Sequence, residues 1–521
     1  MSGEDPRPLH ADGGVEAKLF SLLANGDWHT AVRTAEEHFP TLLSRSPGAL
    51  AAAYDAVPPE QLATSPRWAV MRTYLTHLLS SPGRSAMYPD PLVMPSPSMR
   101  PADRIMVQTA TIASLRTRGR FAPAAEMVDT AGNALRRFSA EERRLLDPYL
   151  SLLLTQWGGT LALAGRLIDA APLLEHAAVE AQRTGNVRTA TEATADLAWV
   201  QALLGEGAAA EDALRRHDAL RLAAPHLVRI RDGARLARAQ RSLDGLDFER
   251  GLELLQDDEG FDELLPLASA LRAVARARSR RGDPMTIRTQ LEVSIGSLPG
   301  WTGGGGMGAA AVAIARSTLP ALAGMHEAAL QMLRVELLPS SQARALVTMR
   351  VSSTLMALGD ADHALVAAKR AARTPFPRSR IESLAVRAAA MRRTRNEVSA
   401  RAAFREAVAL AEEHSLPAAL VSLTAADLSV LGASVGAAGL VRTIDERSLL
   451  FPEAPYGYHR LTPQQFSTLR ALADSDTVER TAERLGVSPA TTKSHVREIY
   501  RRFGVNNRAA ALAEGRRRGL I

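Results

Sequence analysis

The segment VSPATTKSHVREIY, residues 487–500, concentrates side chains that can bind a polyanion. Only three lysines occur in the chain, and one of them, Lys493, lies here. If the segment is a helix that turns by about 100° per residue, Ser494, Arg497 and Arg501 fall on the same face as Lys493. Lysine and arginine on such a face can donate hydrogen bonds to guanine acceptors in the major groove of DNA. The spacing therefore predicts a base-reading helix over residues 489–503.

The opposite face of this predicted helix is apolar. Val496, Ile499 and Phe503 recur at helical spacing, and Thr492 falls on the same side. An apolar stripe of this kind predicts packing against neighbouring helices. Because Thr492 would then be buried, we expect its hydroxyl to donate to the carbonyl of Ser488, one turn earlier.

The surrounding sequence supplies helices that can position this face. Thr462 is followed by proline, as expected for an N-cap and first helical position, and begins the helical stretch LTPQQFSTLRALAD. A second helix begins at Thr477 and ends at Gly486, and Ser488 caps the basic helix. A last helix begins at Asn507. Two short helices joined by a tight glycine-containing turn predict a helix-turn-helix within a four-helix domain, residues 460–521, after a linker over residues 451–459.

The motifs LTPQQ, AERLGVSPATTKSHVREIYRRFGVNNRAAA and RRRGL resemble the C-terminal DNA-binding domain of LuxR-type (GerE-like) transcriptional regulators. This resemblance covers residues 460–521. It implies that bases are contacted by Lys493, Ser494 and Arg497. It also implies that four residues lie near phosphates: Thr491, Arg501, Asn507 and Arg508. In this family the last helix often forms the dimer contact, which leaves a homodimer open.

Several positions depart from the family pattern. Gln464 and Gln465 replace the usual arginine and glutamate, Arg480 and Thr481 replace an acid and an isoleucine, and Thr492 replaces a buried valine. The preference for a particular promoter is therefore not implied by the resemblance.

A different pattern runs through residues 1–450. A small residue follows an apolar helical stretch and precedes an alanine-rich one, mostly at steps of 35–46 residues, the length of one helical hairpin. Glycine or asparagine there can take the left-handed conformation that ends a helix before the chain reverses. The pattern resembles tetratricopeptide-type repeats, and it predicts an all-α protein whose first 450 residues form a TPR-like α-solenoid; an irregular helical bundle stays open. The turn residues are Gly26, Gly83, Gly119, Gly165, Gly205, Gly245, Gly282, Gly324, Gly359 and Asn396.

Composition and charge restrict the partners. The chain has no cysteine, which excludes disulfides, thiolate metal sites and a cysteine nucleophile. Residues 461–521 hold eleven basic and six acidic side chains, so the positive charge is concentrated there and favours double-stranded DNA over a membrane. The amino terminus does not resemble a signal peptide and no apolar run has the length of a membrane helix, so we expect a cytoplasmic protein.

Two motifs of nucleotide and metal chemistry are absent from the sequence. The run PGWTGGGGMG, residues 299–308, matches GxGxxG by its glycines alone, without the strands of a dinucleotide fold, and is interpreted as a loop. The sequence contains no GxxxxGK[ST] or HExxH motif. We therefore expect no enzyme activity, no cofactor and no metal.

Together these observations predict a bacterial, sequence-specific transcriptional regulator of the LuxR type. Its helical-repeat region would control it by binding a protein or a small ligand, whose identity the sequence does not specify. The alternative is a helical-repeat interaction scaffold with a degenerate DNA-binding tail. Gln464, Gln465 and Thr481 favour that alternative.

Overall fold

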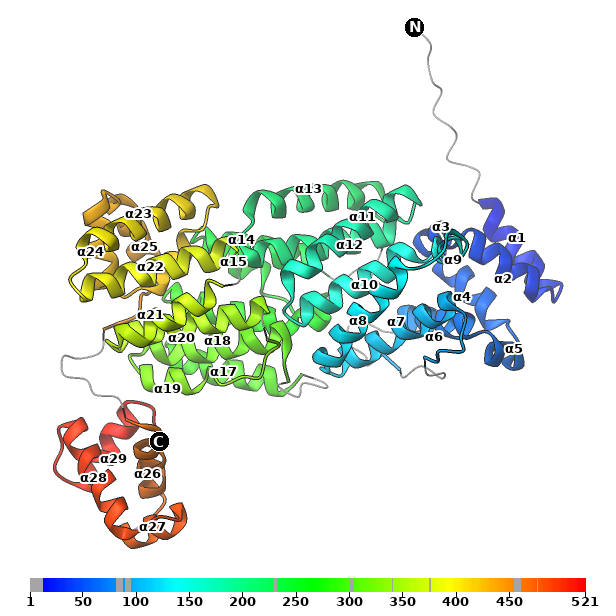
Figure 1. Ribbon diagram of the computed structural model, residues 1–521. Coiled ribbons are helices and arrows are strands. Elements are labelled where there is room, and N and C mark those ends of the chain that lie inside the picture. Colours follow the sequence, from blue (N-terminus) through cyan, green and yellow to red (C-terminus); the bar gives the residue numbers. More distant parts are fainter. Residues whose placement is uncertain are drawn as a thin grey trace. The chain divides into compact units, whose positions relative to one another are not determined.

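The computed structural model describes residues 13–80, 88–89, 95–227, 232–298, 304–339, 341–373, 376–453, 461–475 and 477–521. Every regular element within these ranges is a helix, and the strand-like pairing found there is an isolated parallel bridge between Thr424 and Phe451. The predicted all-α fold is confirmed (Figure 1). Among the helices of these ranges, none combines the length and apolarity that a membrane crossing requires.

Two compact units make up the chain, and each contains segments that are distant in sequence. The first unit comprises residues 1–240, 254–268 and 298–308, and the second comprises residues 241–253, 269–297 and 309–521. The predicted repeat region therefore contributes to both units. The elements α14 (Gly233–Asp244), α15 (Phe248–Leu254), α16 (Leu265–Arg278) and α18 (Gly306–Leu322) each have residues in both.

The first unit contains the helices from α1 to α13 and a short 3₁₀ helix. Their bounds are α1 (Gly13–Ala24), α2 (Trp28–Glu37), α3 (Phe39–Arg45), α4 (Pro47–Asp55), α5 (Pro59–Thr64), α6 (Pro66–Ser80), α7 (Pro101–Thr117), α8 (Phe121–Arg136), α9 (Ala140–Leu146), α10 (Leu150–Leu163), α11 (Leu167–Arg183), α12 (Val187–Leu204), α13 (Gly207–Ala223) and η1 (Asp262–Leu264).

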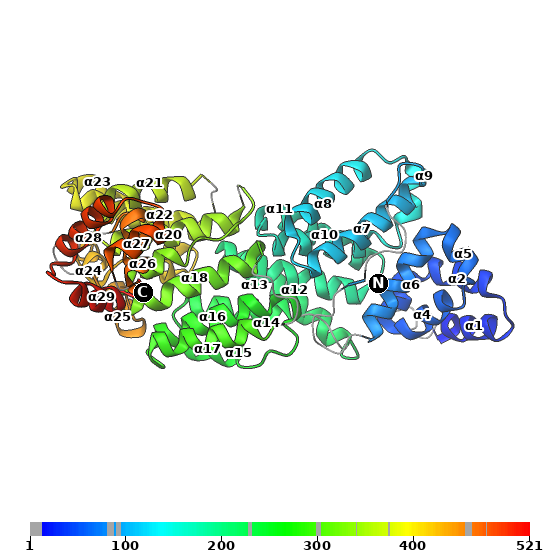
Figure 2. The same ribbon diagram turned by 90° about the horizontal axis from the view of Figure 1, so that it is seen from below.

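The second unit contains the remaining elements. Their bounds are α17 (Pro284–Gly296), α19 (His326–Gln331), α20 (Gln342–Ala357), α21 (Ala361–Ala371), α22 (Pro377–Arg393), α23 (Glu397–Glu413), η2 (Pro417–Ser422), α24 (Ala425–Val435), α25 (Ala438–Arg447), α26 (Pro463–Ala473), α27 (Val478–Leu485), α28 (Pro489–Phe503) and α29 (Arg508–Arg517). Figures 1 and 2 both show α22 beside α23, one of the helical hairpins of this unit.

Small residues let the helices of a hairpin approach closely. In the pair α10 and α11, Ala170 and Ala177 are fully buried. Gly158 of α10 faces Leu174 of α11, and a Cβ at Gly158 would lie 2.7 Å from the Leu174 Cγ. A larger residue at Gly158 would thus force the two helices apart.

Six of the predicted turn glycines take the left-handed conformation that ends a helix. They are Gly26, Gly119, Gly165, Gly205, Gly324 and Gly359. Gly282 has a φ of 133°, and the left-handed residue at the end of α16 is instead Arg280 (φ 59°). Two further predicted turn residues are wrong by one position. The left-handed residue is Leu246 (φ 63°) instead of Gly245, and Arg395 (φ 62°) instead of Asn396. Gly83 lies outside the described residues. The predicted pattern of helical hairpins is confirmed at most of its turns. The specific likeness to tetratricopeptide repeats stays a prediction.

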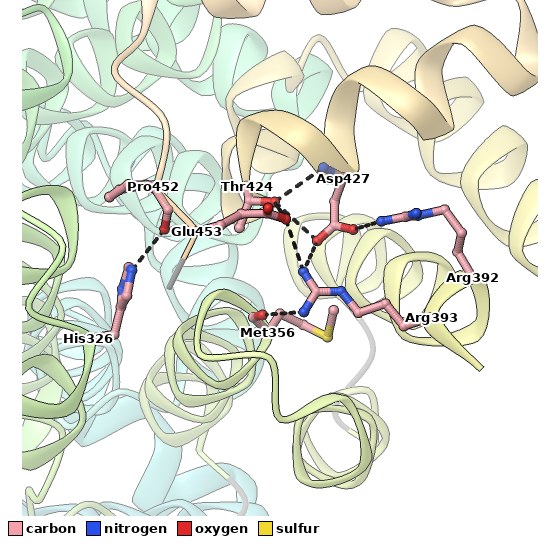
Figure 3. A network of polar contacts seen from close by, with 8 residues as sticks. All are labelled: His326, Met356, Arg392, Arg393, Thr424, Asp427, Pro452 and Glu453. Atoms are coloured by element: carbon pink, nitrogen blue, oxygen red, sulfur yellow. Dashed lines mark hydrogen bonds and ion pairs between the residues drawn. The ribbon is translucent and has the colours of Figure 1, made fainter. Parts of the chain in front are cut away.

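The chain stays packed against the second unit after α25 ends. Residues 448–453, which we call the strap segment, include Ser448 and Phe451, both almost completely buried. The predicted linker, residues 451–459, thus begins inside a packed segment, and its residues 454–459 lie outside the described residues. Figure 3 shows the polar contacts at the end of the strap segment.

A carbonyl and a carboxylate fasten this end. The Pro452 carbonyl accepts a hydrogen bond from His326 Nε2 at 2.8 Å. Glu453 Oε1 lies 3.4 Å from both Arg393 Nη2 and Thr424 Oγ1. Arg393 also bonds the fully buried Asp427 through Nη2 at 2.7 Å. The strap segment is therefore tied to α19, α22 and α24 before the chain continues (Figure 3).

Candidate DNA-binding interface

Capped helix ends fix the four helices of residues 461–521. Thr462 and Gln465 form a capping box, in which Thr462 Oγ1 accepts from the Gln465 N–H at 3.3 Å and Gln465 Oε1 accepts from the Thr462 N–H at 2.9 Å. Gly486 ends α27 with φ 65°, and Ser488 Oγ accepts from the Thr491 N–H at 3.1 Å. The predicted N-caps and turn are confirmed, so α27 and α28 form a helix-turn-helix.

The apolar face of α28 packs as the sequence predicts. Thr492, Val496, Ile499 and Phe503 are its buried residues. Ile499 and Phe503 belong to a core that includes Leu469 of α26, which is fully buried. Thr492 Oγ1 donates to the Ser488 carbonyl at 3.3 Å, which confirms the expected back-bond. This packing fixes the rotation of α28 and hence which side chains face outward.

The outward face carries the predicted base-reading residues together. Lys493, Ser494 and Arg497 are all exposed on α28. Lys493 Nζ lies 3.5 Å from Glu479 Oε1 of α27, with both side chains about three-fifths exposed (59% and 63%). A pair this exposed contributes about 0–1 kcal/mol and can open when a phosphate or base competes for the lysine. Sequence spacing did not reveal Glu479, because it lies on another helix.

Residues 459–513 match the family described as bacterial regulatory proteins, luxR family. The chain carries a LuxR-family helix-turn-helix domain. Two relatives, each described as probable transcriptional regulatory protein NarL, come from Mycobacterium tuberculosis strains CDC 1551 / Oshkosh and ATCC 25618 / H37Rv. Each is 35% identical over 83 residues, which cover 16% of this chain and 36% of the relative. The chain thus spans about a third of the length of these relatives.

At the carboxyl end of α28 in the LuxR-family domain, Glu498 organises two arginines. Arg501 Nε donates to Glu498 Oε2 at 2.9 Å and Arg502 Nε donates to Glu498 Oε1 at 3.0 Å. These hydrogen bonds, from Arg501 and then Arg502, lower the pKa of Glu498 to about 2, so it is ionised at neutral pH. Arg501 remains exposed and oriented at the helix surface, which suits the predicted phosphate contact.

The other three predicted phosphate residues of the LuxR-family domain have structural contacts of their own. Thr491 Oγ1 lies 2.8 Å from Ser488 Oγ, and Asn507 Oδ1 accepts from the Ala510 N–H at 2.8 Å as the N-cap of α29. Arg508 Nη2 donates to the carbonyls of Leu472 at 2.9 Å and Ser475 at 2.5 Å, which closes the end of α26. Their role at phosphates stays a prediction.

The outward face of α28 in the LuxR-family domain presents hydrogen-bond donors. Across the described part of the chain, no cluster of three or more histidine, cysteine, aspartate or glutamate side chains could hold a metal ion. What the arrangement offers chemically is a cationic, hydrogen-bonding helix face whose orientation is fixed by its core.

Proposed function

We propose that this protein is a sequence-specific transcriptional regulator that reads the major groove of double-stranded DNA with α28. The observation that carries the proposal is the division of α28 into two faces: Thr492 and Ile499 are fully buried, while Lys493 and Arg497 are exposed on the other side. A helix of this width fits the major groove, where lysine and arginine donate to guanine O6 and N7. The match to the luxR family and the NarL relatives support the same function.

The roles of individual residues are those that the resemblance to the luxR family implies. Lys493, Ser494 and Arg497 contact bases in this proposal. Phosphates are contacted by Thr491, Arg501, Asn507 and Arg508, which hold the register of the helix without reading sequence. The helical-repeat region controls the regulator by binding a protein or a small ligand, as helical arrays commonly do. No enzymatic activity is part of the proposal.

The test uses the full chain and two DNAs. A binding site is first selected from a random pool of duplex oligonucleotides, and affinities are then measured by fluorescence anisotropy at fixed salt. We expect Lys493→Ala and Arg497→Ala each to weaken binding to the selected site by about 1–3 kcal/mol, with a smaller loss on unrelated DNA.

Arg516→Ala is the matched control, because Arg516 is exposed on α29 and its loss removes one positive charge away from the reading face. It should weaken binding to both DNAs by a similar small amount. If Lys493→Ala and Arg497→Ala lose as much affinity for unrelated DNA as for the selected site, α28 does not read bases. If no sequence is enriched at all, the chain is not a sequence-specific regulator.

A further inference from the structure

The strap segment covers two arginines inside the second unit. The Leu449 N–H donates to the Arg278 carbonyl at 2.7 Å, and Arg278 Nη1 donates back to the Leu449 carbonyl at 2.6 Å. The ring of Phe451 lies 4.7 Å from the guanidinium carbon of Arg278 and 5.2 Å from that of Arg350. One aromatic ring therefore contacts guanidinium groups from two helices, α16 and α20.

These arginines are buried but incompletely bonded. Arg278 is only 2% exposed, and its Nη2 has no hydrogen-bond partner within the described residues. The same holds, over those ranges of the chain, for Nε and Nη1 of Arg350. Buried N–H groups without acceptors are costly, and native proteins rarely keep them without a reason. Three unpartnered donor atoms around one ring call for an acceptor that the protein itself does not supply.

The local charges are also unbalanced. Asp244 is fully engaged by Arg378, with Nη1 to Oδ1 and Nη2 to Oδ2 both at 2.7 Å. Among the described residues, Glu382 is the acid whose charge acts on both Arg278 and Arg350. Burial, and after it the neighbouring charge of Arg350, lower the pKa of Arg278 to about 9. Arginine side chains stay protonated at neutral pH, so Arg278 and Arg350 bring two positive charges to the single carboxyl group of Glu382.

We propose that Arg278 and Arg350 form a binding site for a small molecule that carries an oxyanion, either a carboxylate or a phosphate group. A guanidinium bonds an oxyanion through N–H groups at its edge, whereas an aromatic ring contacts its face. Phe451 can therefore hold both guanidinium groups in place, while their unpartnered N–H groups donate hydrogen bonds to the oxyanion of the ligand. The strap segment is part of the site and does not compete for it.

A ligand at these edges favours the state in which Phe451 is seated, because Phe451 fixes the arginines that bind it. The strap segment directly precedes the residues that lead to the LuxR-family domain. Ligand binding should then be coupled to how the strap segment holds the start of the connection to the LuxR-family domain. Only this coupling, and not the binding site itself, rests on the proposed function. Anion binding itself can be measured without DNA.

The experiment is calorimetric titration of the full chain with inorganic phosphate and, separately, with acetate, in buffers matched for ionic strength with chloride. We expect one saturable site for at least one of the two probes, and the stronger probe identifies the oxyanion class. Arg350→Gln should weaken that binding at least tenfold. Arg401→Gln, which removes the same charge from an exposed position on α23, should leave it unchanged.

Phe451→Leu provides a second variant that keeps both arginines, and it should also weaken binding, because the guanidinium groups lose the ring that fixes them. Thermal unfolding of each variant checks that it is folded. The proposal is overturned if neither probe shows saturable binding to the wild-type chain, or if folded Arg350→Gln binds the probes as tightly as wild type. DNA binding can fail or succeed independently of either result.

Discussion

Thr492 illustrates how a single residue is accommodated at a position where the family usually has valine. Its side chain is fully buried, and its hydroxyl is satisfied by the Ser488 carbonyl, which also accepts from the Thr492 N–H at 3.0 Å. The hydroxyl bond at 3.3 Å is long, and the carbonyl keeps its backbone donor without it. The polar atom thus contributes little to the stability of the domain.

We therefore expect Thr492→Val to stabilise residues 461–521 by about 0.5–1 kcal/mol, because a methyl group replaces a buried hydroxyl while the Ser488 carbonyl stays bonded. Urea unfolding of the full chain, followed by circular dichroism, measures the change. Thr491→Val is the control: Thr491 is exposed, so no gain is expected. A loss of stability in Thr492→Val would mean that the back-bond anchors α28 more strongly than its length indicates.

At the scale of elements, the strap segment and α19 form a connection that depends on a neutral histidine. His326 is 1% exposed, and a carbonyl can only accept, so His326 Nε2 carries the hydrogen in its bond to Pro452. Within the described residues, His326 Nδ1 has no hydrogen-bond partner. Burial lowers the pKa of His326, because protonation would place an uncompensated charge there.

This pKa shift predicts a pH dependence with a defined sign. Above the unfolded pKa of about 6.5, His326 is neutral in both states and costs nothing. As the pH falls below that value, the unfolded chain binds a proton that the folded chain resists, so stability decreases until the folded pKa is reached. His217 and His77, whose pKa values burial also lowers, act in the same direction.

His326→Gln isolates the contribution of one histidine, because glutamine keeps an N–H donor for the Pro452 carbonyl and does not titrate. The stability lost between pH 7.5 and pH 5 should be smaller in this variant than in wild type, as measured by urea unfolding at each pH. An identical loss in the two proteins would show that His326 titrates as freely when folded as when unfolded.

Helical hairpins could be predicted from the sequence because a left-handed helix end favours glycine. Two of the three errors have local causes. Leu246 takes the left-handed conformation while 3% exposed, so burial of its side chain offsets the backbone strain. Asn396 is instead the N-cap of α23, accepting from the Ser399 N–H at 3.3 Å, and Arg395 takes the strained position. Which residue of a turn is left-handed depends on packing that local sequence does not contain.

In the candidate DNA-binding interface, too, the features within one helix could be predicted from the sequence, and the contacts between helices could not. Helical spacing was sufficient to place Lys493, Ser494 and Arg497 on one exposed face, because that inference needs only one helix. The ion pair of Lys493 with Glu479 and the bonds of Arg508 to α26 join different helices. The oxyanion site joins α16, α20 and the strap segment, so no sequence pattern could have indicated it.

For the whole molecule, the excess positive charge is concentrated in the LuxR-family domain. Residues 461–521 carry an excess of five positive charges, whereas the other 460 residues, with 52 basic and 50 acidic side chains, are nearly neutral. Attraction to DNA should therefore act mainly on the LuxR-family domain and decline steeply with salt. Because each chain contributes one α28, the proposed function predicts one half-site bound per chain in the complex.

We expect the full chain to bind as a dimer to two inverted half-sites whose centres lie about 10 base pairs apart, one turn of the duplex. Binding to such a DNA should be tighter than to a single half-site, and inserting about 5 base pairs between the halves should abolish the gain, because the second half-site then faces the opposite side of the helix. Sedimentation of the protein–DNA complex gives the number of chains, and anisotropy gives the affinities. Equal affinity for one and two half-sites, with one chain per DNA, would establish a monomeric reader, whose specificity would have to come from a single α28.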